Sequence, residues 1–504
     1  MRLQFIRCAQ TAGIDGRGSG MGAKGSVQTQ KTLAARIAFI VAAAAIVVCG
    51  MVLPTPDGLT YAGKMSIALL LAGLVLWVAE PVPLFISGLA IMILLPCFGV
   101  SPFLNATDPS TGATTIGIWG NFISNVIFFI LASFGITAAL LKTRIPKKLV
   151  FTLLKAARGS SRGVVGAFML VAAVISLFIS DLPCIALLTG IAVSSILELQ
   201  GLEPGKSNLG KALMIGITYA GVVGGQGIPS GSAMNIMAMG MLQAQAGIQI
   251  SFLGWSIICM PIAAILLVVC WLSVTTVFKL EPIDQAILDH IQEEYEQSGK
   301  LDAFDWKVIA IIGLAFCLWV ASNWTGWDIT AISILCLVLF FLPGVDVLTM
   351  PEYMRSVSWN VVILIGCVQS IASGVKDTGA AKWLFSSTLG NAALAGAPMV
   401  ALVAALLPLL KILIPVGPAF IAICLIPLTG MAPALGVSPV VFAVMIGVNA
   451  STTFIMGVDS ANLLSYRYRY WTLVDFFKAG ILPTIAMIAL HATILLPLVG
   501  LAGY

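Results

Sequence analysis

Two short polar stretches interrupt the apolar helices of this chain, and they hold the residue types best suited to chemistry. The first covers residues 224–235 and the second residues 448–462. Within hydrocarbon, backbone that is not helical must be satisfied by protein, water or a bound ion. A matched pair of such breaks, one in each half of a membrane protein, is typical of a transporter's binding site.

The first break supplies many oxygen atoms and little bulk. Its glycines let the backbone approach a ligand closely, while Ser230, Ser232 and Asn235 add hydroxyl and amide groups. Oxygens of these kinds are suitable ligands for sodium. Close helix packing through small residues is the alternative interpretation, but it explains poorly why small and polar residues recur together in both halves. The chain has no G-x-x-x-x-G-K-S/T motif, which argues against a phosphate loop.

An acid lies at the predicted turn of a first helical hairpin. Pro183 stops the helix there and pushes the residue before it out of the helical region, so Asp181 sits at a break at membrane depth. A buried acid in a membrane segment is energetically costly and usually functional. Asp181 could hold a cation or a proton, or it could cap the half-helix that follows. The two roles are compatible.

A second hairpin has a rigid tip at residues 414–419, which contain two prolines and a glycine. Lys411 precedes this tip in a long apolar run. It could contact an anionic substrate, or it could extend to the lipid headgroups. Asp459 lies inside the second break and could join a cation site or cap the helix after it.

The composition identifies an integral membrane protein. Of 504 residues, 59% are hydrophobic and only 9% are charged, whereas soluble domains carry about 25% charged residues. Apolar segments of about 20 residues fit roughly eleven times between Arg36 and Leu501. Their continuous apolar pattern argues against a β-barrel. The net charge of +5 reflects the loops and does not indicate a nucleic-acid partner.

Cysteine and histidine usage points away from cofactor and enzyme chemistry. The ten cysteines form no C-x-x-C motif, and His290 and His491 are far apart. Neither a disulfide framework nor a zinc site is therefore expected. No paired carboxylates or nucleophile with a base converge in the sequence, so we expect no cofactor and no enzymatic activity.

The chain divides into two membrane halves. The expected units are a disordered cytoplasmic tail at 1–35, a first span and loop at 36–64, a first repeat at 65–278 with its hairpin at 164–200, a cytoplasmic linker at 279–306, and a second repeat at 307–504 with its hairpin at 398–430. Residues 142–162 are basic and lack acids, which predicts a cytoplasmic interfacial helix. The N-terminus is then cytoplasmic and the C-terminus lies outside.

The two halves match beyond their breaks. Residues 95–100 resemble residues 342–345, Trp119 pairs with Trp359, and Asn235 pairs with Asn462. An odd number of spans in each half would place the second copy upside down in the bilayer. The sequence therefore predicts an all-α polytopic membrane protein of about eleven helices in two inverted repeats.

Four segments resemble the divalent anion/sodium symporter family. Residues 76–83 are similar to its W-x-x-E-x-x-P opening, residues 224–235 to G-G-x-x-T-x-x-G-T-P-P-N, residues 450–462 to A-S-x-A-F-M-L-P-V-x-T-P-P-N, and residues 478–480 to K-A-G. The resemblance covers nearly all of residues 65–500. It implies two re-entrant hairpins, a homodimer and an elevator-type transport domain.

The resemblance also implies which residues bind. Hairpin tips and breaks of the family hold the anion, which here gives these candidates: Ser180, Asp181, Gly227, Ser230, Ser232, Asn235, Val416, Gly417, Pro418, Asp459, Ser460 and Asn462. The two sodium sites of the family correspond to these candidates: Ser176, Ser180, Asp181, Gly224, Gly225, Asn449, Ser451 and Thr452.

The hairpin tips depart from the family's Ser-Asn-Thr pattern. The first tip keeps Ser180 but has Asp181 for asparagine and Leu182 for threonine, and the second tip, 416–418, has lost all three. The expected function is a sodium-coupled carrier of a small anion, similar to a di- or tricarboxylate or to sulfate, in the inner membrane. A proton-coupled carrier or a sodium-independent exchanger on the same fold remains an alternative. An ion channel is the alternative of another class.

Overall fold

The structure is a computed structural model that describes residues 33–107, 114–156, 159–297, 299–381, 383, 387, 395–414, 416–457 and 459–504. Residues 1–32 of the predicted tail lie outside the described residues, as do Pro415 in the second hairpin tip and Val458 in the second break. Within the described residues, the first helix is α2, and it begins at Leu33, inside the predicted tail.

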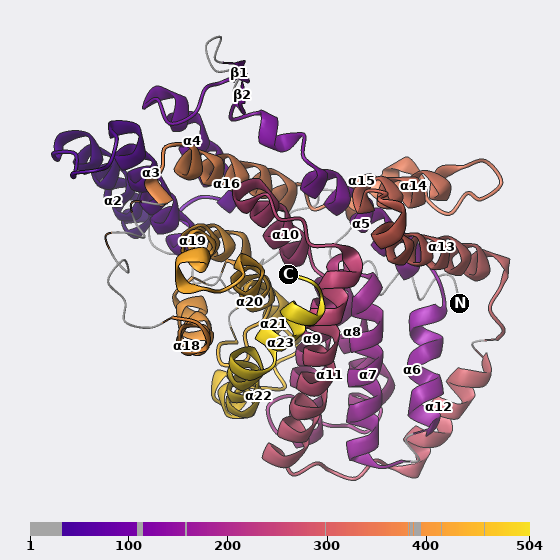
Figure 1. The fold of residues 1–504 in the computed structure, drawn as a ribbon. Coiled ribbons are helices and arrows are strands. Elements are labelled where there is room, and N and C mark those ends of the chain that lie inside the picture. Colours follow the sequence, from indigo (N-terminus) through magenta and orange to yellow (C-terminus); the bar gives the residue numbers. More distant parts are fainter. Residues whose placement is uncertain are drawn as a thin grey trace.

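The first half of the chain is almost entirely helical (Figure 1). Its elements are α2 (Leu33–Val52), α3 (Tyr61–Ala79), α4 (Leu84–Cys97), β1 (Ala106–Thr107), β2 (Thr114–Thr115), η1 (Gly120–Phe122), α5 (Asn125–Leu141), α6 (Ile145–Ala156), α7 (Ser161–Phe178), α8 (Asp181–Ala192), a π-helical turn η2 (Val193–Leu197), α9 (Asn208–Gln226), η3 (Pro229–Gly231), α10 (Ala233–Ala246) and α11 (Phe252–Val277). The two strands form one short antiparallel pair, with Ala106 opposite Thr115.

The second half is also almost entirely helical and follows a connecting helix. Its elements are α12 (Gln285–Gln297), α13 (Ala303–Thr325), α14 (Ile329–Phe341), α15 (Met350–Ser356), α16 (Trp359–Asp377), α18 (Ala397–Leu413), α19 (Gly417–Met431), η4 (Ala432–Leu435), α20 (Pro439–Ser451), α21 (Ser460–Tyr466), α22 (Leu473–Thr493) and α23 (Leu495–Leu501). The predicted linker at 279–306 thus contains a helix, α12, which packs on α6 (Figure 1).

Nine helices within the described residues are long and apolar enough to cross a membrane. Shorter apolar helices accompany them at 84–97, 181–197, 329–341, 397–413 and 439–451. These are the elements next to hairpin turns, helix breaks and loops, so their lengths alone do not say which of them crosses a bilayer. The multi-pass helical architecture is confirmed, while the number eleven stays a prediction.

Small polar residues start many of these helices. Ser160, Ser207 and Ser251 each accept a hydrogen bond from the backbone N–H three residues later, and Asp302 and Thr472 form capping boxes. These caps satisfy amide groups that a helix start leaves unpaired. In an apolar surrounding an unpaired amide is especially costly, so the caps fix where each helix begins.

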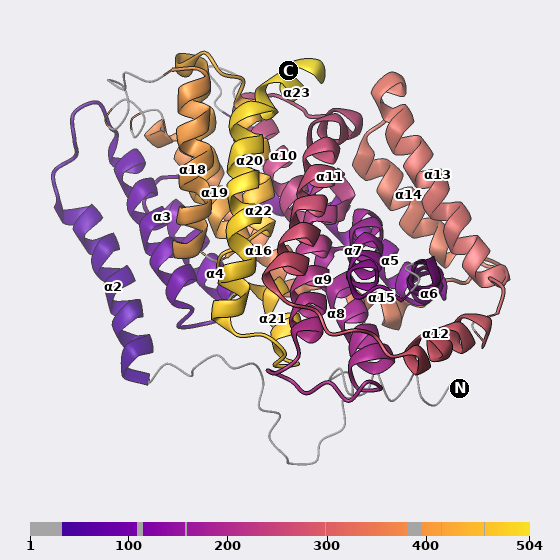
Figure 2. The same cartoon turned by 90° about the horizontal axis from the view of Figure 1, so that it is seen from below.

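Helices of one half pack on helices of the other half. Helix α4 packs on α16, and α14 packs on α5; likewise α8 packs on α21, and α19 packs on α10. Figure 2 shows α2 at one edge of the bundle and α13 with α14 at the opposite edge, with the hairpin helices and broken helices between them. Each half therefore completes its packing with elements of the other.

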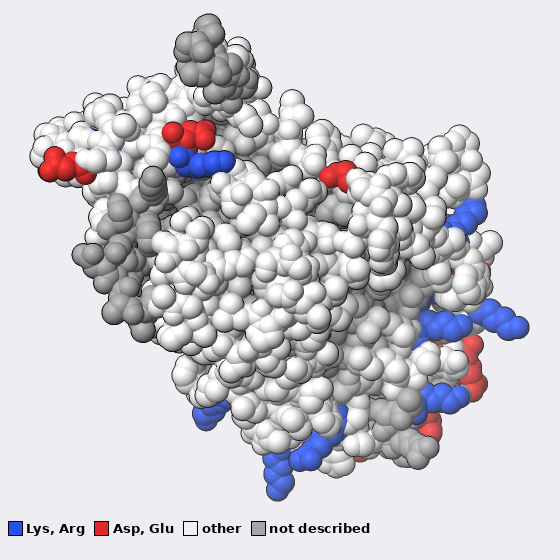
Figure 3. All heavy atoms as spheres, viewed as in Figure 1, with Lys and Arg blue, Asp and Glu red and all other residues white. Residues whose placement is uncertain are grey.

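Charged side chains lie mainly at the margins of the molecule. In Figure 3 the broad face in view is nearly free of them, and most of the visible lysines and arginines lie along its lower and right-hand margins. The helices under that face carry many exposed apolar residues, such as Leu406, Leu409 and Ile485. A large exposed apolar surface of this kind is what a lipid-facing belt requires.

Candidate functional site at the two broken helices

Both predicted breaks are interruptions between two half-helices. Helix α9 ends at Gln226 and α10 begins at Ala233, with the short turn η3 between them. Helix α20 ends at Ser451 and α21 begins at Ser460. Helices α9 and α20 are buried along almost their whole length. The breaks therefore lie at the polar ends of two central, buried helices.

Each break is held by an asparagine. The Asn235 amide donates to the carbonyls of Gly225 at 2.8 Å and Ile228 at 3.0 Å. The Asn462 amide donates to the carbonyls of Thr453 at 3.4 Å and Met456 at 2.9 Å. Carbonyls at the end of α9 and in the non-helical backbone of the breaks thus gain protein partners where no lipid group could supply them.

The end of α7 lies against the first break and brings oxygen atoms together there. Ser230 donates a hydrogen bond to the Leu177 carbonyl at 3.2 Å. A methyl group added at Gly225 would lie 3.2 Å from Ser176 Oγ and 3.0 Å from the Gly231 carbonyl oxygen. Both distances are shorter than ordinary van der Waals contact, so glycine suits this place where two backbones meet.

Two buried oxygens at this place have no hydrogen-bond partner among the described residues, Ser176 Oγ and the Asn235 side-chain oxygen. Unpaired buried polar atoms are costly and call for an explanation. A cation would provide one, because hydroxyl, amide and carbonyl oxygens are its ordinary ligands. The chemistry of this donor set therefore fits a sodium ion.

Asp181 lies at the tip of the first hairpin, where α7 ends and α8 begins. Its carboxylate accepts hydrogen bonds from Ser180 Oγ at 3.1 Å and from the Leu182 N–H at 3.0 Å. The Ser180 N–H donates in turn to Thr137 Oγ1 of α5 at 3.4 Å. Asp181 is buried. It therefore helps to cap α8, and it places a carboxylate inside the protein.

The second break holds an ion pair. Lys411 Nζ lies 3.4 Å from the Asp459 carboxylate, and its side chain is 1% exposed. The same ammonium lies 5.8 Å from the centre of the Phe420 ring. Asp459 also accepts hydrogen bonds from Thr453 at 3.4 Å and Ser460 at 3.1 Å. Lys411 is thus turned into the protein and does not extend to lipid headgroups, which was one of its two predicted roles.

The two breaks contact each other directly. Gln226, the last residue of α9, donates through its side-chain amide to the Thr452 hydroxyl, and its carbonyl accepts from Trp255 Nε1 at 3.0 Å. Gly417, at the start of α19, lies against Met234 of the first half and the Ala450 carbonyl. Gln226, Trp255 and Thr137 were missed by the sequence analysis, although Gln226 stands inside the glycine-rich stretch.

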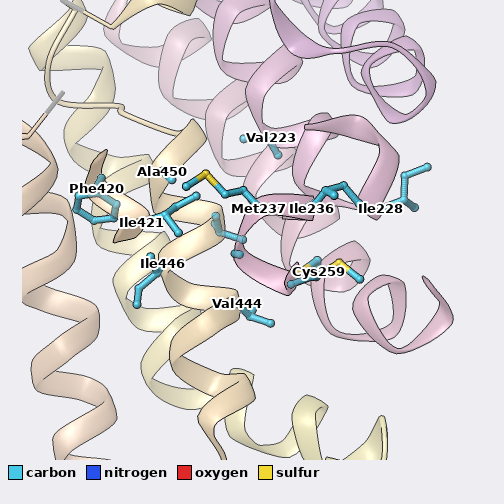
Figure 4. Packing of buried hydrophobic residues seen from close by; sticks show 14 of the residues in the cluster. Val223, Ile228, Ile236, Met237, Cys259, Phe420, Ile421, Val444, Ile446 and Ala450 are labelled. Carbon is cyan, nitrogen blue, oxygen red and sulfur yellow. The ribbon is translucent and has the colours of Figure 1, made fainter. Parts of the chain in front are cut away.

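Apolar side chains fill the space around these polar contacts. Figure 4 shows Val223, Ile236 and Met237 of the first half beside Ile421, Phe420 and Ala450 of the second. A small pocket next to the second break is lined by Pro408, Thr452, Thr453, Phe454, Ile455, Thr484 and Met487. The polar groups of the breaks therefore lie in a surrounding of low polarity, where charge interactions are strong.

The remaining predicted site residues differ in how they are placed. Asn449 donates within its own helix to Met445, and its side-chain oxygen has no partner among the described residues. Ser451 turns back to carbonyls of its own helix. Ser232 caps α10, and Gly227 packs near Leu177 and Met260. Val416 and Pro418 lie at the start of α19.

Comparisons with known proteins agree with this architecture. A family model described as the sodium:sulfate symporter transmembrane region matches residues 32–498. A sodium-dependent dicarboxylate transporter of Staphylococcus saprophyticus is 28% identical over 359 residues, which are 65% of this chain and 65% of that protein. A sodium-dependent dicarboxylate transporter of Staphylococcus aureus is 25% identical over 354 residues, again 65% of each chain. The match thus spans 65% of the length of these relatives, which is slightly less than two thirds.

One solved structure supports the fold. It is a crystal structure of the YdaH transporter of Alcanivorax borkumensis, described as having an unusual topology. The likeness has a TM-score of 0.51 at 12% sequence identity, and it covers 84% of this chain and 98% of that one. At this level of identity the comparison supports only the arrangement of the helices.

Proposed function

Because the chain belongs to the sodium:sulfate symporter family, we propose that it is a secondary transporter that moves a small anion across a membrane, coupled to sodium. The observation that carries this proposal is the pair of asparagine-held breaks, which meet at the contact between Gln226 and Thr452. Two such breaks in matching halves are the usual frame of a binding site between transporter repeats.

The charges at the breaks support cation coupling. Asp181 stands at the start of α8 and Asp459 at the N-cap of α21, and α8 packs on α21. Lys411 lies beside Asp459. With all three side chains ionised, the region carries one more negative than positive charge, which would repel an anion. A solution cation bound near Asp181 would remove that excess and let the anion bind, so binding of the two would be coupled.

Sodium is favoured over a proton by the donor set of the first break. Ser176 Oγ and the Asn235 side-chain oxygen are buried without partners among the described residues, and these atoms could serve as ligands of a metal cation. Proton coupling through Asp181 is the second candidate, because a carboxyl group can also be neutralised by protonation. Sodium-independent exchange and channel activity are outcomes of the test below.

The substrate is proposed as a class. The named relatives are sodium-dependent dicarboxylate transporters, so succinate-like dicarboxylates come first. At the second tip, Val416 and Gly417 offer backbone groups where the family pattern has a serine and an asparagine. Citrate, sulfate and monocarboxylates therefore belong in the same screen.

Several finer features are part of the proposal. The reciprocal packing of α4 on α16 and α14 on α5 supports two inverted repeats, and the helix ends at Phe178 and Leu413 support two re-entrant hairpins. We extend the proposal to an elevator-type movement, a homodimer, and an inner-membrane location with the N-terminus cytoplasmic and the C-terminus outside. The basic helix α6 supports this orientation.

The direct test uses the full-length protein reconstituted in liposomes. Uptake of labelled succinate, citrate, sulfate and monocarboxylates is measured under an inward sodium gradient, a proton gradient or a gradient of counter-anion. We expect accumulation of one anion class only with the sodium gradient. Accumulation with protons or only by exchange would select an alternative, and conductance without accumulation under any gradient would identify a channel and overturn the proposal.

A further inference from the structure

The caps of the two second half-helices differ in charge. Ser232 is the N-cap residue of α10, and Asp459 is the N-cap residue of α21. Each stands three residues before the asparagine that holds its break, Asn235 or Asn462. The two caps therefore occupy equivalent positions, with a neutral hydroxyl in the first half and a carboxylate in the second.

At a second pair of equivalent positions, the second half carries a positive charge where the first half is neutral. Ser176 is the third-last residue of α7, and Lys411 is the third-last residue of α18. Each is a buried residue of its hairpin that lies against the break of its own half: Ser176 lies by Gly225, and Lys411 by Asp459. The second half thus carries an ammonium where the first half carries a hydroxyl.

Together, the two differences place an ion pair in the second half at positions where the first half has two serines. A buried charge without a partner is costly, so neither Lys411 nor Asp459 would be tolerated easily alone. The ammonium also lies near the Phe420 ring at 5.8 Å, a position in which an aromatic face attracts a cation. The surroundings of Lys411 Nζ include a carboxylate and a ring face, and both suit a positive charge.

The acid of the first half has no such lysine at the equivalent place. Asp181 receives hydrogen bonds from Ser180 and the Leu182 N–H, and the residue equivalent to Lys411 is Ser176. At the start of the second hairpin's α19 stands Gly417, where α8 begins with Asp181. In the first half, the Asp181 carboxylate therefore accepts its hydrogen bonds from neutral donors. In the second half, the Asp459 carboxylate lies beside the Lys411 ammonium.

We propose that the Lys411 ammonium is a built-in cation that occupies the cation position of the second half, so that only the first half takes a cation from solution. This inference rests on the proposed function, because it concerns the cation sites of the same transport site. It predicts one dissociable sodium site where a pair of equivalent halves would otherwise provide two. The charge of Lys411 remains in the protein throughout the transport cycle.

The test measures sodium binding without requiring transport. Thermal unfolding of the purified full-length protein is followed while sodium chloride replaces choline chloride at constant ionic strength. The increase of the midpoint temperature with the logarithm of sodium concentration depends on the number of sodium ions bound. In Lys411→Ser, Asp459 loses its ammonium and recruits a second sodium ion, so we expect this slope to rise about twofold.

Three further variants make the result specific. Lys411→Arg keeps a positive charge and should keep the wild-type slope. The double variant Lys411→Ser with Asp459→Ser removes the recruiting carboxylate and should return the slope to that of the wild type. Lys211→Ser is the matched control, because Lys211 forms a similar ion pair with Asp475 at 3.1 Å, and neither residue belongs to a break. It should leave the sodium slope unchanged.

An unchanged slope in folded Lys411→Ser would overturn the inference. If that variant cannot be purified in a folded state, the wild type decides instead: sodium activation of uptake should give a Hill coefficient of about one, and a value of about two would overturn the inference. Failure of the proposed function is a separate result, namely the absence of anion flux under every gradient, and it does not affect the unfolding measurement.

Discussion

Asn235 and Asn462 hold their two breaks by the same pattern of hydrogen bonds. The acceptor carbonyls lie ten and seven residues before Asn235, and nine and six residues before Asn462. In both breaks the two acceptors are therefore three residues apart. Two side chains far apart in the sequence thus perform one structural task in each half, which ties the internal similarity of the sequence to atomic contacts.

Replacing either asparagine should damage the site. Two buried carbonyls lose their donor in Asn235→Ala, and two part-buried carbonyls lose theirs in Asn462→Ala. Leaving a buried group of this kind unpaired costs about 1–3 kcal/mol. We expect a lower unfolding midpoint and at least a tenfold loss of anion uptake in liposomes. Asn208→Ala is the control, since that amide donates to the Lys279 carbonyl at an exposed place. Normal uptake by either break variant would contradict the assigned role.

The breaks could be predicted because their signal is local. Glycine, serine and asparagine clustered inside apolar runs stand out at 224–235 and 448–462, and the structure interrupts helices at both. Asp181 was equally visible, because a proline two residues later marks the helix start. Features of this kind can be recognised from neighbouring residues in the sequence, without knowing their tertiary contacts.

The partners of the site residues could not be predicted in the same way. Gln226 and Thr452 are 226 residues apart, and Ser180 contacts Thr137 of another helix. Lys411 was noticed for its apolar surroundings, yet its pairing with Asp459 depends on how the second hairpin packs on the second break. These contacts are set by tertiary packing, which residue spacing does not encode.

The loop helix α15 offers a test outside the membrane helices. Lys142 Nζ lies 2.9 Å from the Glu352 carboxylate. Burial raises the pKa of Glu352, but hydrogen bonds from Lys142 and Thr349 outweigh it and hold the pKa below its usual value. A depressed pKa means stabilisation that is complete above the unfolded-state value and lost as the pH falls through the folded-state value.

Glu352→Gln should therefore imitate acidification at α15. We expect lower protection of the backbone amides of residues 350–356 at neutral pH, measured relative to their intrinsic exchange rates, and little further loss of protection when the pH is lowered below 4. The effect corresponds to about 1 kcal/mol or less, because the pair is partly exposed. Glu203→Gln, at the exposed pair with Lys206, is the control. Exchange in α15 that does not respond to either change would refute the prediction.

The close contact of α7 with α9 should tolerate no added methyl group. A Cβ at Gly224 would overlap the backbone of Ala173, which cannot move without shifting α7. Gly224→Ala should destabilise the protein by about 1–3 kcal/mol, seen as a lower unfolding midpoint in detergent. Gly313→Ala, within α13, meets no atom within 4 Å and should be neutral or slightly stabilising. Equal midpoints for the two variants would show that the contact is not tight.

Asp181 is the residue whose removal should change the ion dependence of transport. Asp181→Asn keeps the shape of the side chain but removes the negative charge that a solution cation would neutralise. We expect weaker sodium activation, with the half-activating sodium concentration raised about tenfold or sodium dependence lost, equivalent to about 1.4 kcal/mol or more of coupling. Uptake is measured against sodium concentration at several pH values in liposomes. Asp328→Asn, a replacement at the N-cap of α14, serves as the control. If Asp181→Asn transports with unchanged sodium and pH dependence, Asp181 does not couple a cation to the anion.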